Sequence, residues 1–556
     1  MIITIPWIGF GIDLSLRIDH LSAFIAVAAN IFGLLVALYC VPFLKGKRYA
    51  GQFYAYLFLS LIFINGAVLA NNLIAMLFFW EGLLVTMFAM IFIGSKDAFR
   101  TAIKAFIIVG ISDLCMMLGI ILTGNLAHTF TMSSINLPLD GLGSAAYILL
   151  MIGAIAKGGS MPFHSWIPDA AIDAPLPFMA FMPAAIEKLM GIYFLARISL
   201  EMFQLTTSSW ISPLLMTIGA LTILLAVMMA LIQKDFKKLL SYHAISQVGY
   251  MILGIGTAVP AGIIGGLFHM INNAMYKSCL FLTGGAVEKQ TGTTDLNRLG
   301  GIAAKMPVTF ICFIITAVSI SGVPPFNGFF SKELVYDGAL ERGLIFYLAA
   351  VIGSFFTAAS FLKLGHAAFI DKPREEHKDV KEVPFAMQLP MILIALGCVI
   401  FGVYNSLPIG LIQPMLGGHS LEGRSFAGFP SNMVLVVITL IVLAAALLNH
   451  LYGVRAKGSG LKAVDHIHYA PVLSGIYDRA EKKVFDPYNI GIYFVTWFSK
   501  ALNWIDKAVD WIYETLTVKI AYFLTYYIRK AHTGNYAVYM AWSLAGLLVV
   551  IIYLVI

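Results

Sequence analysis

The sequence predicts an all-α polytopic membrane protein. Of its 556 residues, 60% are hydrophobic and only 12% are charged, and the mean hydropathy is +0.87. Soluble domains contain about half apolar residues, so this composition excludes a soluble fold. The apolar residues form long runs, and short stretches rich in Lys and Arg separate many of them. This pattern is typical of helices that cross a bilayer and of the loops between them.

Fourteen apolar runs are long enough to span a membrane, which requires about 20 residues in a helix. The predicted spans are 21–44, 53–70, 72–94, 101–123, 146–170, 175–200, 210–232, 239–259, 261–287, 306–337, 343–370, 384–404, 430–452 and 534–556.

Positive charge orients these spans, because cytoplasmic loops are enriched in Lys and Arg. Alternate loops contain the clusters Lys45/Lys47/Arg48, Lys96/Arg100, Lys234/Lys237/Lys238, Lys289/Arg298/Lys305, Lys372/Arg374/Lys378/Lys381 and Arg455/Lys457/Lys462. The intervening loops at 124–145 and 201–209 have no Lys or Arg, and the later ones have only Arg342 and Arg424. We therefore expect a multi-pass protein of the inner (cytoplasmic) membrane with both termini on the outer face.

Two other function classes find no support in the sequence. The net charge of +7 comes largely from these loop clusters, so we expect no nucleic-acid partner. The five cysteines form no Cys-x-x-Cys pair, and no glycine-rich nucleotide loop follows a strand. We expect no cofactor in this chain, so any redox chemistry belongs to partner subunits. The N-terminus shows no signal-peptide pattern.

A short internal repeat interrupts two of the spans. The fragment Gly159-Ser160-Met161-Pro162-Phe163 resembles Gly322-Val323-Pro324-Pro325-Phe326. Proline removes a helical hydrogen bond, and in lipid the freed backbone groups must face protein or water. The two spans are five apart and so run in opposite directions, which predicts an inverted five-helix repeat with two broken helices, at Gly158, Gly159 and Pro162 and at Pro324 and Pro325. Two ordinary proline-kinked helices are the alternative.

Ionisable residues lie inside several spans, where each costs about 2.5–3.5 kcal/mol on insertion scales. They are Glu81, Lys104, Asp113, Lys157, Glu187, Lys188, His269, Lys277 and Lys332. A buried lysine beside a carboxylate can take or release a proton when its partner moves, so the set predicts a proton relay. The alternative for each residue is a snorkelling side chain or a structural ion pair, which applies most to Lys104 and Asp113.

These residues lie in segments that resemble the antiporter-like subunits of respiratory complex I, the Mrp-type cation/proton antiporters and the group 4 membrane-bound hydrogenases. The matching segments include Trp80-Glu81-Gly82, Lys104 to Asp113, Lys157 to Pro162-Phe163-His164-Ser165-Trp166, Ser246 to Tyr250, Phe268-His269 to Lys277, and Phe329-Phe330-Ser331-Lys332. The resemblance implies a Glu81–Lys157 pair in the first repeat, a central Lys277 and a terminal Lys332 at the outer exit. It places His269 on the connecting polar axis and adds His164 to the proton-translocation residues.

The chain departs from the family pattern near its centre. Asn273 and Pro183 stand where many complex I relatives have histidines, and Glu187-Lys188 occupies a stretch that is usually apolar there. We therefore expect a rewired central relay.

The C-terminal region predicts an amphipathic helix. No Pro or Gly occurs between Gly491 and Gly534, and Trp497, Trp504 and Trp511 recur every seven residues. Several charged residues make this stretch a poor span, so we expect it to lie along the membrane surface. The distal complex I subunit has such a lateral helix before a final anchor, and the resemblance is closest to that subunit.

The resulting division of the chain has seven parts. They are an outer N-terminal segment (1–20), a first helix and loop (21–52), two antiporter-like repeats (53–200 and 201–370), two further helices (371–462), a lateral-helix region (463–533) and an anchor helix (534–556).

Three hypotheses of function remain open. The leading one is a subunit that pumps H+ or Na+ for a complex I-related redox enzyme, with iron–sulfur, flavin or nickel–iron centres in hydrophilic partner subunits. The second is an Mrp-type antiporter subunit with no redox partner. The third is a non-conducting scaffold, which the intact Glu81, Lys157 and Lys332 disfavour. In the first two, other antiporter-like and small membrane subunits and the lipid bilayer are the expected partners.

Overall fold

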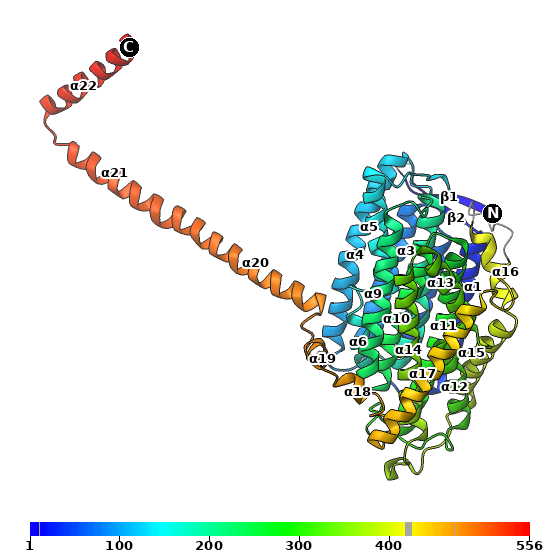
Figure 1. Ribbon diagram of the computed structural model, residues 1–556. Helices are drawn as coiled ribbons and strands as arrows, with labels where there is room; N and C mark the ends of the chain where they lie inside the picture. Colours follow the sequence, from blue (N-terminus) through cyan, green and yellow to red (C-terminus); the bar gives the residue numbers. More distant parts are fainter. Residues whose placement is uncertain (10–11, 417–424, 472) are drawn as a thin grey trace. The chain divides into compact units, whose positions relative to one another are not determined.

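The computed structural model describes residues 1–9, 12–416, 425–471 and 473–556, so Arg424 lies outside the described residues. The chain forms two units, Met1–Pro487 and Tyr488–Ile556. The first is a helical bundle (Figure 1). Its helices are α1 (His20–Phe43), α2 (Ala50–Leu69), α3 (Leu73–Phe92), α4 (Ala98–Ala127), α5 (Gly141–Gly158), α6 (Trp166–Asp173), α7 (Leu176–Phe181), α8 (Glu187–Arg197), α9 (Ile211–Ile232), α10 (Phe236–Gly256), α11 (Pro260–Thr291), α12 (Pro307–Ser321), α13 (Asn327–Arg342), α14 (Leu344–Gly365), α15 (Phe385–Val403), α16 (Ser406–Ile412), α17 (Met433–Lys457), α18 (Asp465–His468) and α19 (Leu473–Glu481).

The predicted class is confirmed: the chain is a polytopic helical membrane protein. Within the described residues, eleven helices are long and apolar enough to cross a membrane. The other three predicted spans correspond to α10, α11 and the interrupted pair α12–α13. Helices α10 and α11 are almost completely buried and contain many polar residues, and α12 and α13 are short. The count of fourteen spans therefore stays a prediction.

Loops that the charge pattern assigns to the same side are joined by hydrogen bonds. At the predicted outer end, the bonds are Asn71 N to Ser15 O, Leu137 N to Met202 O and Arg342 Nη2 to Thr207 O. At the predicted inner end, they are Ser95 N to Asp173 O, Leu296 N to Lys234 O and Lys289 Nζ to Pro42 O. The structure thus groups the loops as the alternation predicts, whereas the side that faces the cytoplasm stays a prediction.

The N-terminal segment forms a β-hairpin that the sequence analysis did not anticipate. Strands β1 (Ile2–Gly9) and β2 (Ile12–Arg17) are antiparallel, with Ile2 opposite Arg17 and a register shift between Pro6 and Gly9. Asp19 then caps α1 by accepting a hydrogen bond from Ser22 N. Burial raises the pKa of Asp19, but the hydrogen bond and charge of Arg197 outweigh this effect and hold the pKa well below its usual range. The cap thus fixes the start of α1 against α8.

The two predicted helix breaks have the same backbone geometry. Helix α5 ends at Gly158 and α12 ends at Ser321. The residues that follow, Gly159 and Gly322, have φ of 79° and 84°, a left-handed conformation that favours glycine. After each glycine, the next N–H bonds back to the last helical turn, from Ser160 to Ile155 O and from Val323 to Val318 O. The repeated fragment therefore encodes a repeated structure, although the five-helix repeat around it stays a prediction.

The second unit is a long helix followed by a shorter one (Figure 1). Helix α20 (Pro487–Asp510) continues through a π-helical turn at Trp511–Leu516 into α21 (Thr517–Ala531), as expected from a stretch without Pro or Gly. Helix α22 (Tyr536–Val555) follows Gly534, whose φ is 74°. Residues 463–486 belong to the first unit, and the long helix begins at Pro487, close to the predicted helical stretch after Gly491.

Candidate ion-translocation site

The first break holds a buried ion pair. Lys157, in the last turn of α5, has its Nζ 3.6 Å from Asp113 Oδ2 on α4, and both side chains are 1% exposed. Asp113 Oδ1 accepts a hydrogen bond of 2.8 Å from the indole Nε1 of Trp80 on α3. The Lys157 ammonium lies 5.0 Å from the centre of the Trp80 ring. Three helices thus place one positive and one negative charge beside the broken end of α5.

Glu81 is not the direct partner of Lys157. No ion pair joins Glu81 to Lys157 among the described residues, and Glu81 Oε1 is buried without a hydrogen-bond partner there. The resemblance implied a Glu81–Lys157 pair, whereas the structure brings Asp113 to Lys157 instead. Glu81 is close enough to interact electrostatically with both residues. A second carboxylate therefore stands near the lysine, with its Oε1 atom unpartnered among the described residues.

Lys188 reaches the same break from α8. A Cβ atom at Gly159 would lie 3.0 Å from Lys188 Nζ, so the ammonium sits against the left-handed glycine. Lys188 is 0% exposed, and its Nζ has no hydrogen-bond partner among the described residues. Glu187, its neighbour in sequence, interacts electrostatically with Lys188 and with Lys157. The residues that depart from the family pattern thus contribute charge directly to the first break.

Lys104 forms two ion pairs, as expected if it has the structural role left open as an alternative. Its Nζ pairs with Asp169 Oδ2 at 2.9 Å and with Asp486 Oδ2 at 2.5 Å. Asp169 also pairs with Lys483, at 2.8 Å. These contacts join α4 and α6 to the segment before the long helix. Both Lys104 partners are far from it in sequence, so the local pattern could not identify them.

Lys332 occupies the second break in a comparable way. It is 1% exposed, and its Nζ donates to Ser354 Oγ at 3.2 Å and lies 5.1 Å from the centre of the Tyr250 ring. A Cβ at Gly322 would lie 3.8 Å from the same ammonium. Glu333, the next residue, accepts a hydrogen bond from Thr439 Oγ1 on α17 instead. Lys332 is thus a buried cation with polar neighbours and not a snorkelling side chain.

A buried polar axis runs through α10 and α11. His269 Nδ1 lies 3.0 Å from Ser331 Oγ on α13, and His269 Nε2 lies 3.1 Å from Gln247 Oε1 on α10 and 3.2 Å from the Tyr276 hydroxyl. Ser331 precedes Lys332, so the axis reaches the second break. Lys277 donates to Leu240 O at 3.2 Å and faces the Phe361 ring at 5.3 Å. All of these residues are buried.

One buried histidine on α10 was not among the predicted site residues, and the two positions where family histidines are replaced, Asn273 and Pro183, lie close together. His243 on α10 is 0% exposed and hydrogen-bonds Ser360, and its place one turn before Gln247 could have identified it. Asn273 donates to Ala184 O at 3.3 Å, within the π-helical turn Met182–Ile186 that contains Pro183. Such turns are frequent at functional sites. Asn273 thus contacts the turn that contains Pro183, so the two positions where family histidines are replaced lie in contacting segments.

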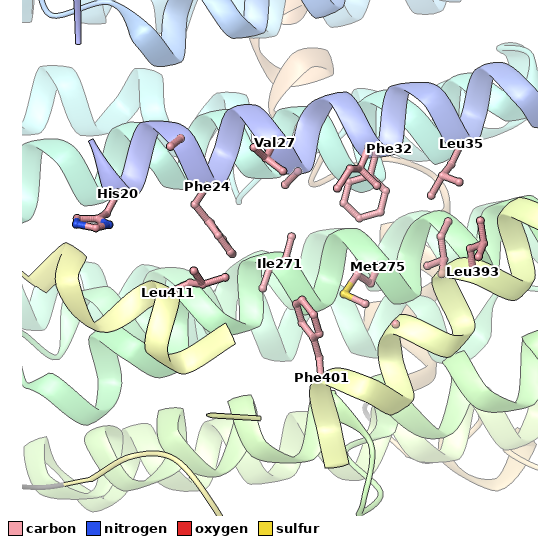
Figure 2. Close-up of a pocket in the computed structure, with 15 residues that line it drawn as sticks. His20, Phe24, Val27, Phe32, Leu35, Ile271, Met275, Leu393, Phe401 and Leu411 are labelled. Atoms are coloured by element: carbon pink, nitrogen blue, oxygen red, sulfur yellow. The ribbon is translucent and has the colours of Figure 1, made fainter. Parts of the chain in front are cut away.

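Two cavities differ sharply in chemistry. A groove of about 580 Å³ between α1, α11 and α15 is lined by apolar side chains, with His20 as its one ionisable lining residue among those described (Figure 2). A cavity of about 420 Å³ beside the first break has a mixed lining: polar residues such as His164, Asp169 and Lys238 lie among apolar ones such as Met161, Leu225 and Phe485. The Nδ1 atom of His164 there is buried without a described partner. The second cavity therefore offers several ionisable side chains, whereas the first offers only His20 among the described residues.

The fold and the site together define an antiporter-like membrane subunit, with buried charges at two helix breaks and a polar axis between them. The chain belongs to the NADH:quinone oxidoreductase/Mrp antiporter family: the model described as "NADH:quinone oxidoreductase/Mrp antiporter, TM" matches residues 70–357. This confirms the predicted family.

Similar curated proteins are components of Na+/H+ antiporters. One from Alkalihalophilus pseudofirmus is 32% identical over 450 residues, which cover 74% of this chain and 55% of that protein. Another, from Staphylococcus haemolyticus, is 31% identical over 490 residues, covering 81% and 60%. The chain thus spans only 55–60% of the length of these relatives.

Two solved membrane complexes share the fold. A chain of the Mrp complex from Dietzia sp. DQ12-45-1b superimposes with a TM-score of 0.68 at 21% identity, covering 75% of this chain and 89% of that one. A chain of the membrane-bound sulfane sulfur reductase, an archaeal respiratory membrane complex, gives a TM-score of 0.69 at 23% identity, covering 100% and 92%.

Proposed function

We propose that this chain is an ion-translocating subunit of a multisubunit membrane antiporter that exchanges a monovalent cation, Na+ or a similar ion, for H+. The observation that carries the proposal is the Lys157–Asp113 pair, buried at 1% exposure beside a broken helix. The names of the curated relatives favour antiport over the redox-coupled pump that the sequence analysis placed first.

The geometry supports translocation by charge displacement. A buried ammonium is costly without a carboxylate, so movement of its partner drives loss of a proton, and return of the partner drives uptake. Asp113 is the partner in this structure, and Glu81 is a second carboxylate within electrostatic range. The cavity at His164 lies beside this break, and the axis through His269 leads towards Lys332.

A redox-driven pump is the second candidate. The observation in its favour is the helical second unit, because the similar chain of a respiratory complex covers this whole sequence, whereas the Mrp chain covers three quarters of it. In that case, hydrophilic partner subunits would hold the iron–sulfur, flavin or nickel–iron centres.

Purification of the native complex separates the two candidates. Antiport predicts that the co-eluting subunits, identified by mass spectrometry, are all membrane proteins without redox centres. Stoichiometric co-elution of hydrophilic iron–sulfur, flavin or nickel–iron subunits would contradict antiport and support the second candidate.

Truncation after Pro487 should release the chain from its complex without unfolding the bundle. The second unit exposes apolar side chains along its whole length, for example Trp497, Trp504 and Trp511, and none of the described residues of α20, α21 and α22 is buried. We expect the truncated chain to accumulate at wild-type level and to migrate apart from its partner subunits on native gels.

A second truncation, after Gly534, is the matched control, because it removes α22 and keeps the long helix. It should retain more of the partner subunits than the first truncation. Full retention of the partners after removal of residues 488–556 would show that the long helix is not a brace.

A further inference from the structure

Trp80 contacts both charges of the first break through different parts of one ring system. Its indole N–H donates to Asp113 Oδ1 at 2.8 Å, and its ring faces the Lys157 ammonium at 5.0 Å. The Lys157–Asp113 contact uses the other carboxylate oxygen, Oδ2, at 3.6 Å. Each ion therefore touches the tryptophan and the other ion.

Within the described residues, the pair has no other side-chain hydrogen bond to hold it. Neither Asp113 Oδ2 nor Lys157 Nζ has a hydrogen-bond partner there. The bond from Trp80 therefore fixes the rotation of the carboxylate, and a hydrogen bond to a charged group is among the stronger ones in a water-poor site.

Trp80 is itself held rigidly. It is 0% exposed, and the Phe194 ring packs edge-on against it from α8, with ring centres 5.5 Å apart and an interplanar angle of 64°. Adjacent helical residues point about 100° apart, so Trp80 and Glu81 leave α3 in different directions. Of the two, Trp80 is the residue that hydrogen-bonds Asp113 in this structure.

We propose that Trp80 is a positioning residue that selects Asp113, and not Glu81, as the resting partner of Lys157. The inference rests on the proposed function, because it specifies how the charge relay starts each cycle. Indole N–H donation orders the carboxylate, and the ring face stabilises the ammonium through a cation–π contact. When the pair separates, Lys157 leaves a site that the tryptophan keeps ready for its return.

The test removes the N–H group alone. Trp80 is replaced with benzothienylalanine, a near-isostere with sulfur in place of N–H, in the complete reconstituted complex. We expect proton flux to fall about tenfold, the scale of losing one hydrogen bond to a charged group. The same replacement at Trp210, which is 56% exposed and outside the site, is the matched control and should leave flux unchanged.

A second pair of variants separates positioning from packing. Trp80→His keeps an aromatic ring and an N–H donor. Trp80→Phe keeps only the ring, but phenylalanine is closer to tryptophan in its apolar character. Positioning predicts more flux in Trp80→His than in Trp80→Phe, and a packing role predicts the reverse order. Wild-type flux with benzothienylalanine, or more flux in Trp80→Phe than in Trp80→His, would overturn the inference.

Lys157→Ala is measured in the same assay, so that failure of the Trp80 inference can be told apart from failure of the proposed function. Loss of flux in Lys157→Ala with normal flux in the Trp80 variants would refute the positioning role alone. Normal flux in Lys157→Ala would refute the relay itself.

Discussion

Replacement of Lys157 by alanine is expected to abolish coupled ion transport while the complex still assembles. The substitution removes the lysine that pairs with Asp113 at the first break, and this carboxylate then has no partner charge to release or recapture. Lys157→Arg should also fail, because a guanidinium keeps its proton at any physiological pH. We expect flux to fall at least about tenfold, which corresponds to about 1.4 kcal/mol in the barrier. The measurement is proton flux per assembled complex in proteoliposomes.

Lys289→Ala is the matched control for this prediction. Lys289 is also a helical lysine, but it bonds the backbone carbonyl of Pro42 near the predicted inner surface, outside the break. Its loss should leave transport close to wild type. Glu81→Ala should also impair transport, since it removes the second carboxylate near Lys157. The relay assignment fails if Lys157→Ala transports like wild type.

Lys332→Gln is expected to block ion release while leaving uptake intact. Lys332 is buried at the second break, and Ser354 is the side chain that accepts its hydrogen bond. The adjacent Glu333 accepts a hydrogen bond from Thr439 instead, since neighbouring residues of a helix point in different directions. We therefore expect the next acceptor to be water or a partner subunit.

Single-turnover measurements check this prediction. A neutral glutamine should permit one round of proton uptake from the predicted cytoplasmic side and then stop, so the steady-state flux is lost. Arg342→Gln, near the predicted outer end of α13, is the control and should keep steady-state flux. Steady-state flux in Lys332→Gln would contradict the exit assignment.

The sequence predicted the features that depend on local pattern. Apolar runs predicted the helices, and Gly159 and Gly322 predicted the breaks, because a left-handed glycine followed by proline ends a helix in either context. Charge alternation predicted which loops lie together. These features follow from neighbouring residues alone.

Features that depend on contacts between distant segments could not be predicted from the sequence. Motif matching paired Lys157 with Glu81, but the choice of Asp113 depends on how α3, α4 and α5 pack, which no local spacing encodes. The same holds for the Lys104–Asp486 contact between distant segments. The N-terminal hairpin was missed because its strands are short and its apolar residues were assigned only to a surface segment.

Sodium–proton exchange through Lys157 is tested by proton flux in proteoliposomes that contain the complete complex, an imposed Na+ gradient and no electron donor. We expect the gradient alone to drive proton movement in wild type and Lys157→Ala to abolish it. No sodium-driven flux in wild type, with flux restored only by an electron donor, would contradict this expectation.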